Sequence, residues 1–144
     1  MVEYIKDYLL QCPLFKDIED DIGIDYQEEQ PDSYSINTIP EQRLISQDII
    51  GNKNMQFSFT VTSRAYTATD LNRIENLNLF EKFADWVNNQ NENGNLPQLG
   101  ENQVATELVI TNNGYLYSNN PDIQNGVYQI QLKLYYIEKM KEVL

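Results

Sequence analysis

Two segments of the chain alternate strictly between apolar and polar residues. In the first segment, one side carries Met55, Phe57, Phe59 and Val61, and the other carries Gln56, Ser58, Thr60 and Thr62. In the second, one side carries Tyr128, Ile130, Leu132, Leu134 and Tyr136, and the other carries Gln129, Gln131 and Lys133. A period of two is that of a β-strand, and a single apolar side predicts a half-buried antiparallel strand.

Shorter alternating runs predict further strands and the turns that separate them. These strands are expected at residues 22–26, 34–38, 42–50, 105–111 and 115–118. The polar sequence Gly51–Asn54 suits a hairpin turn between the strand at 42–50 and the long strand at 55–66. Asn113-Gly114 is a dipeptide favoured in tight hairpin turns, and Asn119–Gly126 predicts a longer polar turn before the last strand.

Helical spacing appears at the start of the chain and again in its middle. Val2–Gln11 reads as a short amphipathic helix that stops before Pro13. A central helix begins near Asp70, ends at Gly94, and places apolar residues three or four positions apart: Leu71, Ile74, Leu77, Phe80, Phe83 and Val87. Asn78 followed by Glu81 resembles a second capping box, which predicts a break and restart near residues 76–78. The charged tail, Glu138–Leu144, is expected to be helical.

The order of these elements predicts the fold class. One helix, several strands, a central helix and then more strands indicate an α+β fold with a mainly antiparallel sheet and helices packed on one face. A length of 144 residues, with no internal repeat and no linker, predicts a single domain over residues 1–144.

Composition excludes most kinds of active site. The chain has no histidine, so a Ser–His or Cys–His nucleophile is impossible. Cys12 is the only cysteine, which rules out an internal disulfide and leaves a poor set of zinc ligands. The glycines are scattered at turns and form no phosphate-binding loop. We therefore expect a protein that is not an enzyme and has no cofactor and no catalytic residues.

The acidic run from Asp17 to Gly23 resembles part of a calcium-binding loop. Glu19, Asp21 and Glu28 fall at ligand positions 3, 5 and 12 of an EF-hand counted from Asp17. Ile22 occupies the position that requires glycine, and alternating residues replace the exit helix. The pattern favours a solvated acidic turn and no metal site.

The net charge is −12, from 22 acidic and 10 basic residues. Nonspecific binding to nucleic acid or anionic lipid normally requires the opposite sign. The charge indicates either a solvated surface that keeps the protein soluble, or a surface that DNA must pass without adhering. The N-terminus lacks a signal-peptide pattern and no segment has the ~20 apolar residues of a membrane span, so we expect a soluble cytosolic protein and no membrane partner.

Three groups of residues are candidates for protein contacts. Phe83 and Trp86 on the central helix either cover the sheet or anchor a partner. The tyrosines of the last third cannot all share one sheet face, so some must be exposed. The tip of the hairpin over residues 42–66 supplies the predicted oligomer interface: Ile49, Ile50 and Met55.

A series of motifs that spans nearly the whole chain resembles a known family. In order, they are YIKDYLLQCPLF, GIDYQEEQPDSYSINTIP, FSFTVTSRAYTATDL, FEKFADWVNNQNENGNLPQL, GYLYS and VYQIQLKLYY. This series is similar to the tail-terminator or tail-completion proteins of Firmicutes tailed phages and prophages, often labelled minor capsid proteins. A contractile bacteriocin particle would use the same part. The specificity lies in the order of the motifs, because no single motif is catalytic or diagnostic.

The resemblance implies a structural virion protein that assembles in the host cytoplasm. Its expected form is a hexameric ring on the head-proximal end of the tail tube, where it ends tube growth and meets the head–tail connector. The expected partners are other copies of the chain, the tail tube protein and the connector, with DNA passing through without specific binding. If six copies assemble, we expect acidic residues to line the channel. The alternatives are another neck component, such as a stopper, or an acidic DNA-mimic adaptor or inhibitor.

Overall fold

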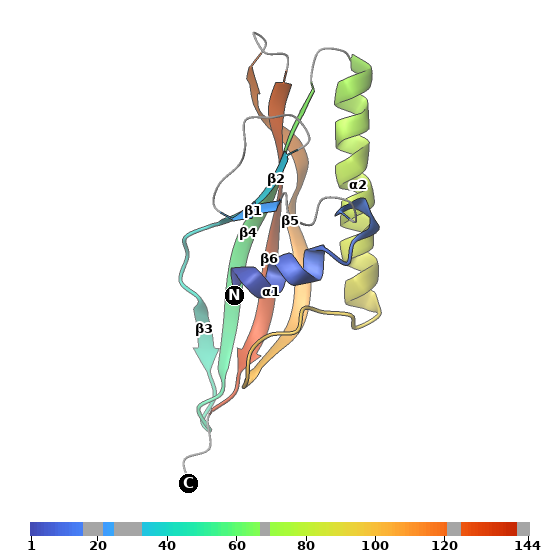
Figure 1. Ribbon diagram of the computed structural model, residues 1–144. Coiled ribbons are helices and arrows are strands. Elements are labelled where there is room, and N and C mark those ends of the chain that lie inside the picture. The colour runs from blue at the N-terminus through green and yellow to red at the C-terminus, as the bar shows by residue number, and fades with distance from the viewer. Residues whose placement is uncertain (16–21, 25–32, 67–69, 121–124, 141–144) are drawn as a thin grey trace.

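A six-stranded sheet carries the two α-helices of the computed structural model on one of its faces (Figure 1). The structure describes residues 1–15, 22–24, 33–66, 70–120 and 125–140. Its elements are α1 (Val2–Leu9), η1 (Pro13–Phe15), β1 (Ile22–Ile24), β2 (Ser33–Thr38), β3 (Leu44–Gln47), β4 (Lys53–Tyr66), α2 (Asp70–Glu92), β5 (Gln103–Asn120) and β6 (Asn125–Glu138). The predicted α+β fold with a mainly antiparallel sheet is confirmed.

The two strictly alternating segments form the centre of the sheet. The strand order is β1-β2-β4-β6-β5. β3 lies off this path and pairs with the first residues of β4, from Lys53 to Met55. β4 and β6 pair antiparallel along their full lengths, from Lys53 opposite Glu138 to Tyr66 opposite Asn125. Only the β1–β2 pair is parallel among the described pairs. The predicted strand character of both segments is therefore confirmed.

The apolar sides of β4 and β6 face the helices and form the core. The buried apolar residues make one cluster that includes Ile5 and Leu9 of α1 and Phe83 and Val87 of α2. The Tyr8 and Trp86 rings, with centroids 5.3 Å apart, join the two helices over this face. Phe83 is 1% exposed and Trp86 is half-buried, and both side chains pack inward. This favours the alternative in which the two residues cover the sheet over the one in which they anchor a partner protein.

The polar side of β4 is also buried, so the expectation of a half-buried strand is wrong. Ser58, Thr60 and Thr62 are 4–6% exposed, although neither helix lies on this face. Their side chains are small, and the longer side chains of β6, Lys133, Gln131 and Gln129, lie opposite them. Ser35 and Thr62 share a hydrogen bond, and Asn37 Nδ2 donates to Thr62 Oγ1 at 3.3 Å. Cross-strand hydrogen bonds therefore satisfy part of this polar ladder.

The predicted tight turn at Asn113-Gly114 is wrong. β5 continues from Gln103 to Asn120, and its register against β6 shifts on both sides of Asn112 and again after Leu116. The two predicted strands at 105–111 and 115–118 are therefore one bulged strand. A Cβ atom on Gly114 would lie only 2.5 Å from Phe80 Cβ, so glycine is needed here for close approach to α2.

The predicted break in the central helix is also wrong, because α2 is continuous from Asp70 to Glu92. An interior asparagine costs a helix only about 0.7 kcal/mol, which is less than the apolar packing of the following turns provides. The predicted end at Gly94 is confirmed. Gly94 has a φ of +73°, and Asn95 N–H donates to Gln90 O at 2.9 Å, as in a glycine-terminated helix.

Several predictions fall partly outside the described residues. The acidic segment considered for calcium lies outside them except for β1, which is a strand as predicted. The predicted turn at 119–126 overlaps the connection between β5 and β6, whose residues 121–124 lie outside the described part. The prediction of a helix at 138–144 is wrong at its first residue, because Glu138 is the last residue of β6. Residues 141–144 lie outside the described part of the chain.

Candidate interaction surface

The β3–β4 hairpin ends in a turn that is held by one carboxylate. Asp48 Oδ1 accepts hydrogen bonds from the backbone N–H groups of Gly51 and Asn52, each at 2.9 Å. Desolvation acts to raise the pKa of Asp48, but hydrogen bonds from the N–H groups of Asn52, Gly51 and Ile50 outweigh it and lower the pKa. Gly51, with φ of +104°, supplies the left-handed residue. The turn is therefore preorganised.

The turn lies earlier in the chain than predicted. β3 covers only residues 44–47 of the expected 42–50, and β4 already begins at Lys53. Lys53 and Asn54, expected in the turn, pair instead with Gln47 and Ser46 of β3. The side-chain hydrogen bonds of Asp48, together with its N–H bond to Asn52 O at 2.9 Å, close the loop over residues 48–52.

The structure brings two of the three predicted interface residues together. Ile49 has a relative exposure of 106% and Ile50 of 69%, so both side chains project from the turn into solvent. Met55 lies in β4 opposite Tyr136 and packs partly buried against the core, away from the turn. Ile49 and Ile50 therefore form the tip of the hairpin, and Met55 supports its base.

Sequence reasoning missed Met140, which borders the same turn. Met140 N–H donates to Asn52 Oδ1 at 2.9 Å, and its sulfur lies 3.0 Å from a Cβ placed on Gly51. Its side chain is 53% exposed. No local signal marks Met140 in the sequence, because its position follows from the pairing of β6 with β4.

The large apolar side chains that remain exposed among the described residues gather at the two ends of an elongated molecule (Figure 1). The hairpin end carries Leu44, Ile45, Ile49, Ile50, Val104 and Met140. At the helix end, the first half of α2 carries Ile74 and Leu77, and Leu116 of β5 lies on the helix side of the sheet, opposite the core residue Tyr128. Tyr115 and Tyr117 of β5 lie on the other side of the sheet, where Gln129 Nε2 donates to Tyr115 OH at 2.9 Å and the two tyrosine rings are in contact. The predicted exposure of some tyrosines is thus confirmed. Both ends therefore carry exposed apolar side chains, and at the helix end these lie on both faces of the sheet.

A groove of about 420 Å³ lies at the helix end between α2 and the bulge of β5. Its apolar lining comes from Leu77, Phe80 and Ala84, and its charged lining consists of Glu81 and Asp85. The remaining lining residues are Asn88, Asn113 and Gly114. An apolar lining beside two carboxylates suits an apolar side chain that is accompanied by basic groups.

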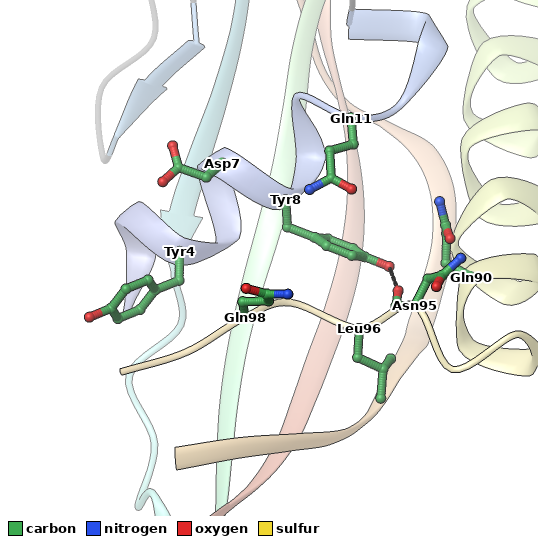
Figure 2. Close-up of a pocket in the computed structure, with 8 residues that line it drawn as sticks. All are labelled: Tyr4, Asp7, Tyr8, Gln11, Gln90, Asn95, Leu96 and Gln98. Atoms are coloured by element: carbon green, nitrogen blue, oxygen red, sulfur yellow. Dashed lines mark hydrogen bonds between the residues drawn. The ribbon is translucent and has the colours of Figure 1, made fainter. Parts of the chain in front are cut away.

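A second, polar groove of about 530 Å³ lies between α1 and the segment that follows α2 (Figure 2). Tyr8 OH donates to the backbone oxygen of Asn95 at 2.6 Å, and Figure 2 shows Gln11, Gln90 and Asn95 around that hydroxyl. Burial and, to a smaller degree, the charge of Cys12 raise the pKa of Tyr8 to about 12. Asp7 is the only carboxylate in the lining. This groove offers hydrogen bonds and no pair of groups for acid–base catalysis.

The one cysteine is not an activated nucleophile. Burial raises the pKa of the Cys12 thiol, and a hydrogen bond from the backbone of Leu14 opposes this only in part. Within the described ranges, no three histidine, cysteine or acidic side chains lie close enough together to hold a metal ion. None of the helices in the part of the chain that the structure describes is long and apolar enough to span a bilayer.

Comparison with protein-family models found no match, and comparison with curated proteins found no significant match either.

Proposed function

We propose that this chain is a non-enzymatic tail terminator that forms a ring on the head-proximal end of a phage tail tube. The ring stops tube growth and joins the tail to the head connector. The observation that carries this proposal is the separation of the exposed apolar side chains into a hairpin end and a helix end. A terminator must contact the tube on one side and the connector on the other, and each end of this molecule carries exposed apolar side chains that suit one of these contacts.

The hairpin end is built for binding without large rearrangement. Its isoleucines are exposed on a turn that Asp48 and Met140 hold in place. A preorganised element loses little conformational entropy when it docks, so more of its contact energy remains as affinity. The edge strand β5 is bulged, which disfavours assembly by simple strand addition and favours contacts through the two ends.

The charge distribution supports a channel that DNA can cross. The exposed charged positions described on α2 are mostly acidic: Glu75, Glu81, Lys82, Asp85 and Glu92. If this helix borders the channel, its carboxylates repel the phosphates of DNA, which carries about one negative charge per 1.7 Å of duplex. A ring whose channel is lined mainly by lysine and arginine would contradict this part of the proposal.

Electron microscopy with purified tail tubes tests the function. The protein is mixed with tubes assembled from the tube protein of the same particle and imaged in negative stain. We expect density at one end of each tube and growth that stops there when more tube protein is added. An unrelated acidic protein of similar size serves as the control. Tubes that continue to grow and show bare ends in the presence of excess protein would refute the proposal.

A further inference from the structure

We infer that Asn93 is a site of spontaneous deamidation, at which its side-chain amide is lost to give aspartate or isoaspartate. The inference goes beyond the proposed function and does not depend on it, because the reaction needs only the chain and water. It rests on the position of the Asn93-Gly94 pair at the exposed end of α2. It rests equally on the contrast with the other two Asn-Gly pairs of the sequence, Asn113-Gly114 and Asn125-Gly126.

The reaction is an attack of the main chain on a side chain. The backbone nitrogen of Gly94 bonds to Asn93 Cγ while the Cγ–Nδ2 bond breaks. The proton of the Gly94 N–H passes through water to Nδ2, which leaves as ammonia. Water then adds to one of the two carbonyl carbons of the resulting five-membered imide and breaks its C–N bond, so that no oxidant or reductant takes part. Glycine favours the attack because no Cβ obstructs the approach of its nitrogen.

The Asn93-Gly94 pair lies where the chain has room to reach the reactive geometry. α2 ends at Glu92, both residues of the pair are exposed, and a Cβ placed on Gly94 meets no atom within 4 Å. The Gly94 N–H donates to Asn91 O at 3.3 Å, beyond the roughly 2.7–3.2 Å of a normal N–H···O bond. Residues 93–95 are all exposed, so opening this last turn uncovers no core side chain. Helix ends open in this way at a low cost in free energy.

The sheet holds the other two pairs in place. Asn125-Gly126 belongs to β6 and is paired with β4 on one side and with β5 on the other, and Gly126 is buried. Asn113-Gly114 lies in the bulge of β5, where a Cβ on Gly114 would come within 2.5 Å of Phe80 Cβ. The reactive geometry there requires strands to separate, or α2 to leave the sheet. The structure therefore favours Asn93 among three pairs that are alike in sequence.

Deamidation changes the end of α2 in two ways. It adds a negative charge beside Glu92, at the helix end where the dipole disfavours negative charge and where the last turn has no basic residue. Isoaspartate also inserts one carbon into the main chain, which displaces Gly94 from its left-handed position at φ of +73°. The hydrogen bond from Asn95 N–H to Gln90 O, now 2.9 Å long, should then be lost.

The altered segment forms one wall of the polar groove beside α1. Asn95 O accepts the hydrogen bond from Tyr8 OH at 2.6 Å, and Figure 2 shows this bond between the two walls. Gln90 and Asn95 both line the groove. A modification at Asn93 should therefore loosen the contact between α1 and the segment that follows α2.

Ageing of the purified chain, followed by mass spectrometry, tests the inference. The folded chain is kept at body temperature and mildly alkaline pH, and samples are digested at mildly acidic pH with a glutamate-specific protease. Cleavage after Glu92 and Glu101 places Asn93 in a separate peptide of residues 93–101. We expect deamidation at Asn93 to be at least about tenfold faster than at Asn113 or Asn125, because paired strands open far less often than a helix end. In urea, which removes this protection, the three pairs should react at similar rates.

Two variants serve as matched controls. Asn93→Gln lengthens the side chain, so the five-membered ring cannot form and the change should be absent. Asn95→Gln alters an exposed asparagine that precedes leucine, and Asn93 should react in this variant as in the unaltered chain. Hydrogen exchange measured by NMR should show that the Asn95 amide loses protection during ageing of the unaltered chain and keeps it in Asn93→Gln.

Two results would overturn the inference. One is equal rates at the three Asn-Gly pairs of the folded chain. The other is a folded chain in which Asn93 stays unmodified while the same residue reacts in urea. An Asn95 amide that stays protected in fully deamidated protein would contradict the expected loosening of the helix end.

Discussion

Replacement of Gly114 by alanine should loosen the packing of α2 on the sheet. The new Cβ would lie 2.5 Å from Phe80 Cβ, 2.8 Å from its Cγ and 3.0 Å from its Cδ2. Real Cβ atoms do not approach other carbon atoms this closely, so either α2 or the bulge of β5 must shift. Rotation of the phenyl ring does not relieve the clash, because the closest atom is the one attached to the helix backbone. Phe80 itself is 3% exposed and belongs to the core.

The size of the effect follows from the cost of overpacking. Forcing an extra methyl group into a packed contact typically costs about 1–3 kcal/mol. For a chain of 144 residues, 1 kcal/mol corresponds to about 3 °C in Tm. We therefore expect Gly114→Ala to lower Tm by about 3–10 °C. The φ angle of Gly114 is not positive, so backbone strain adds nothing to this figure.

Gly100→Ala is the matched control, measured by differential scanning calorimetry beside Gly114→Ala. A Cβ on Gly100 would meet Tyr4 OH at 3.1 Å, and this atom is the far end of a side chain that can rotate away. Gly100 also has no positive φ. Its replacement should change Tm by less than about 2 °C, which corresponds to the usual ±0.5 kcal/mol of a tolerated substitution. Equal Tm values for the two variants would refute the reasoning about close approach.

Three further predictions concern titration and reactivity. The folded-state pKa of Tyr8, about 12, exceeds its ordinary value of 10.0, so the unfolded chain releases this proton first and stability should fall by about 2–3 kcal/mol as pH rises from 10 to 12. Tyr8→Phe should remove that loss in urea unfolding at pH 9 and 11.5, and identical pH dependence in both proteins would contradict the assignment. Because the pKa of Asp48 is lowered, its hydrogen bonds persist above that pKa and should be lost as pH falls through it, which NMR detects as a shift of the Asn52 amide. Asp48→Ala lacks the acceptor, so its Asn52 amide should show no such shift with pH, whereas an Asn52 amide of the unaltered chain that is constant down to pH 2 would oppose this account. The buried Cys12 thiol should react with a thiol reagent only after the protein is unfolded, and full labelling of the folded protein would be inconsistent with its burial.

Local patterns in the sequence determined the core of the sheet, the end of α2 and part of the candidate surface. β4 and β6 were predicted with the correct faces because their alternation has the period of a strand over many residues. Gly94 marked the end of α2 because a left-handed residue is needed there. Ile49 and Ile50 were placed at an exposed tip because they directly precede the polar turn residues.

The tertiary structure decided the features that depend on distant partners. Asn113-Gly114 looks locally like a turn, but β6 pairs with β5 on both sides of it, and Phe80 requires a glycine at that position. Met140 reaches the hairpin turn, and Met55 is drawn to the core, only because β4 and β6 pair in one register. The grooves and the two apolar ends arise in the same way, from segments far apart in the chain. A local pattern specifies the conformation of neighbouring residues, whereas a surface depends on which elements pack together, and that is set by the burial of the whole core.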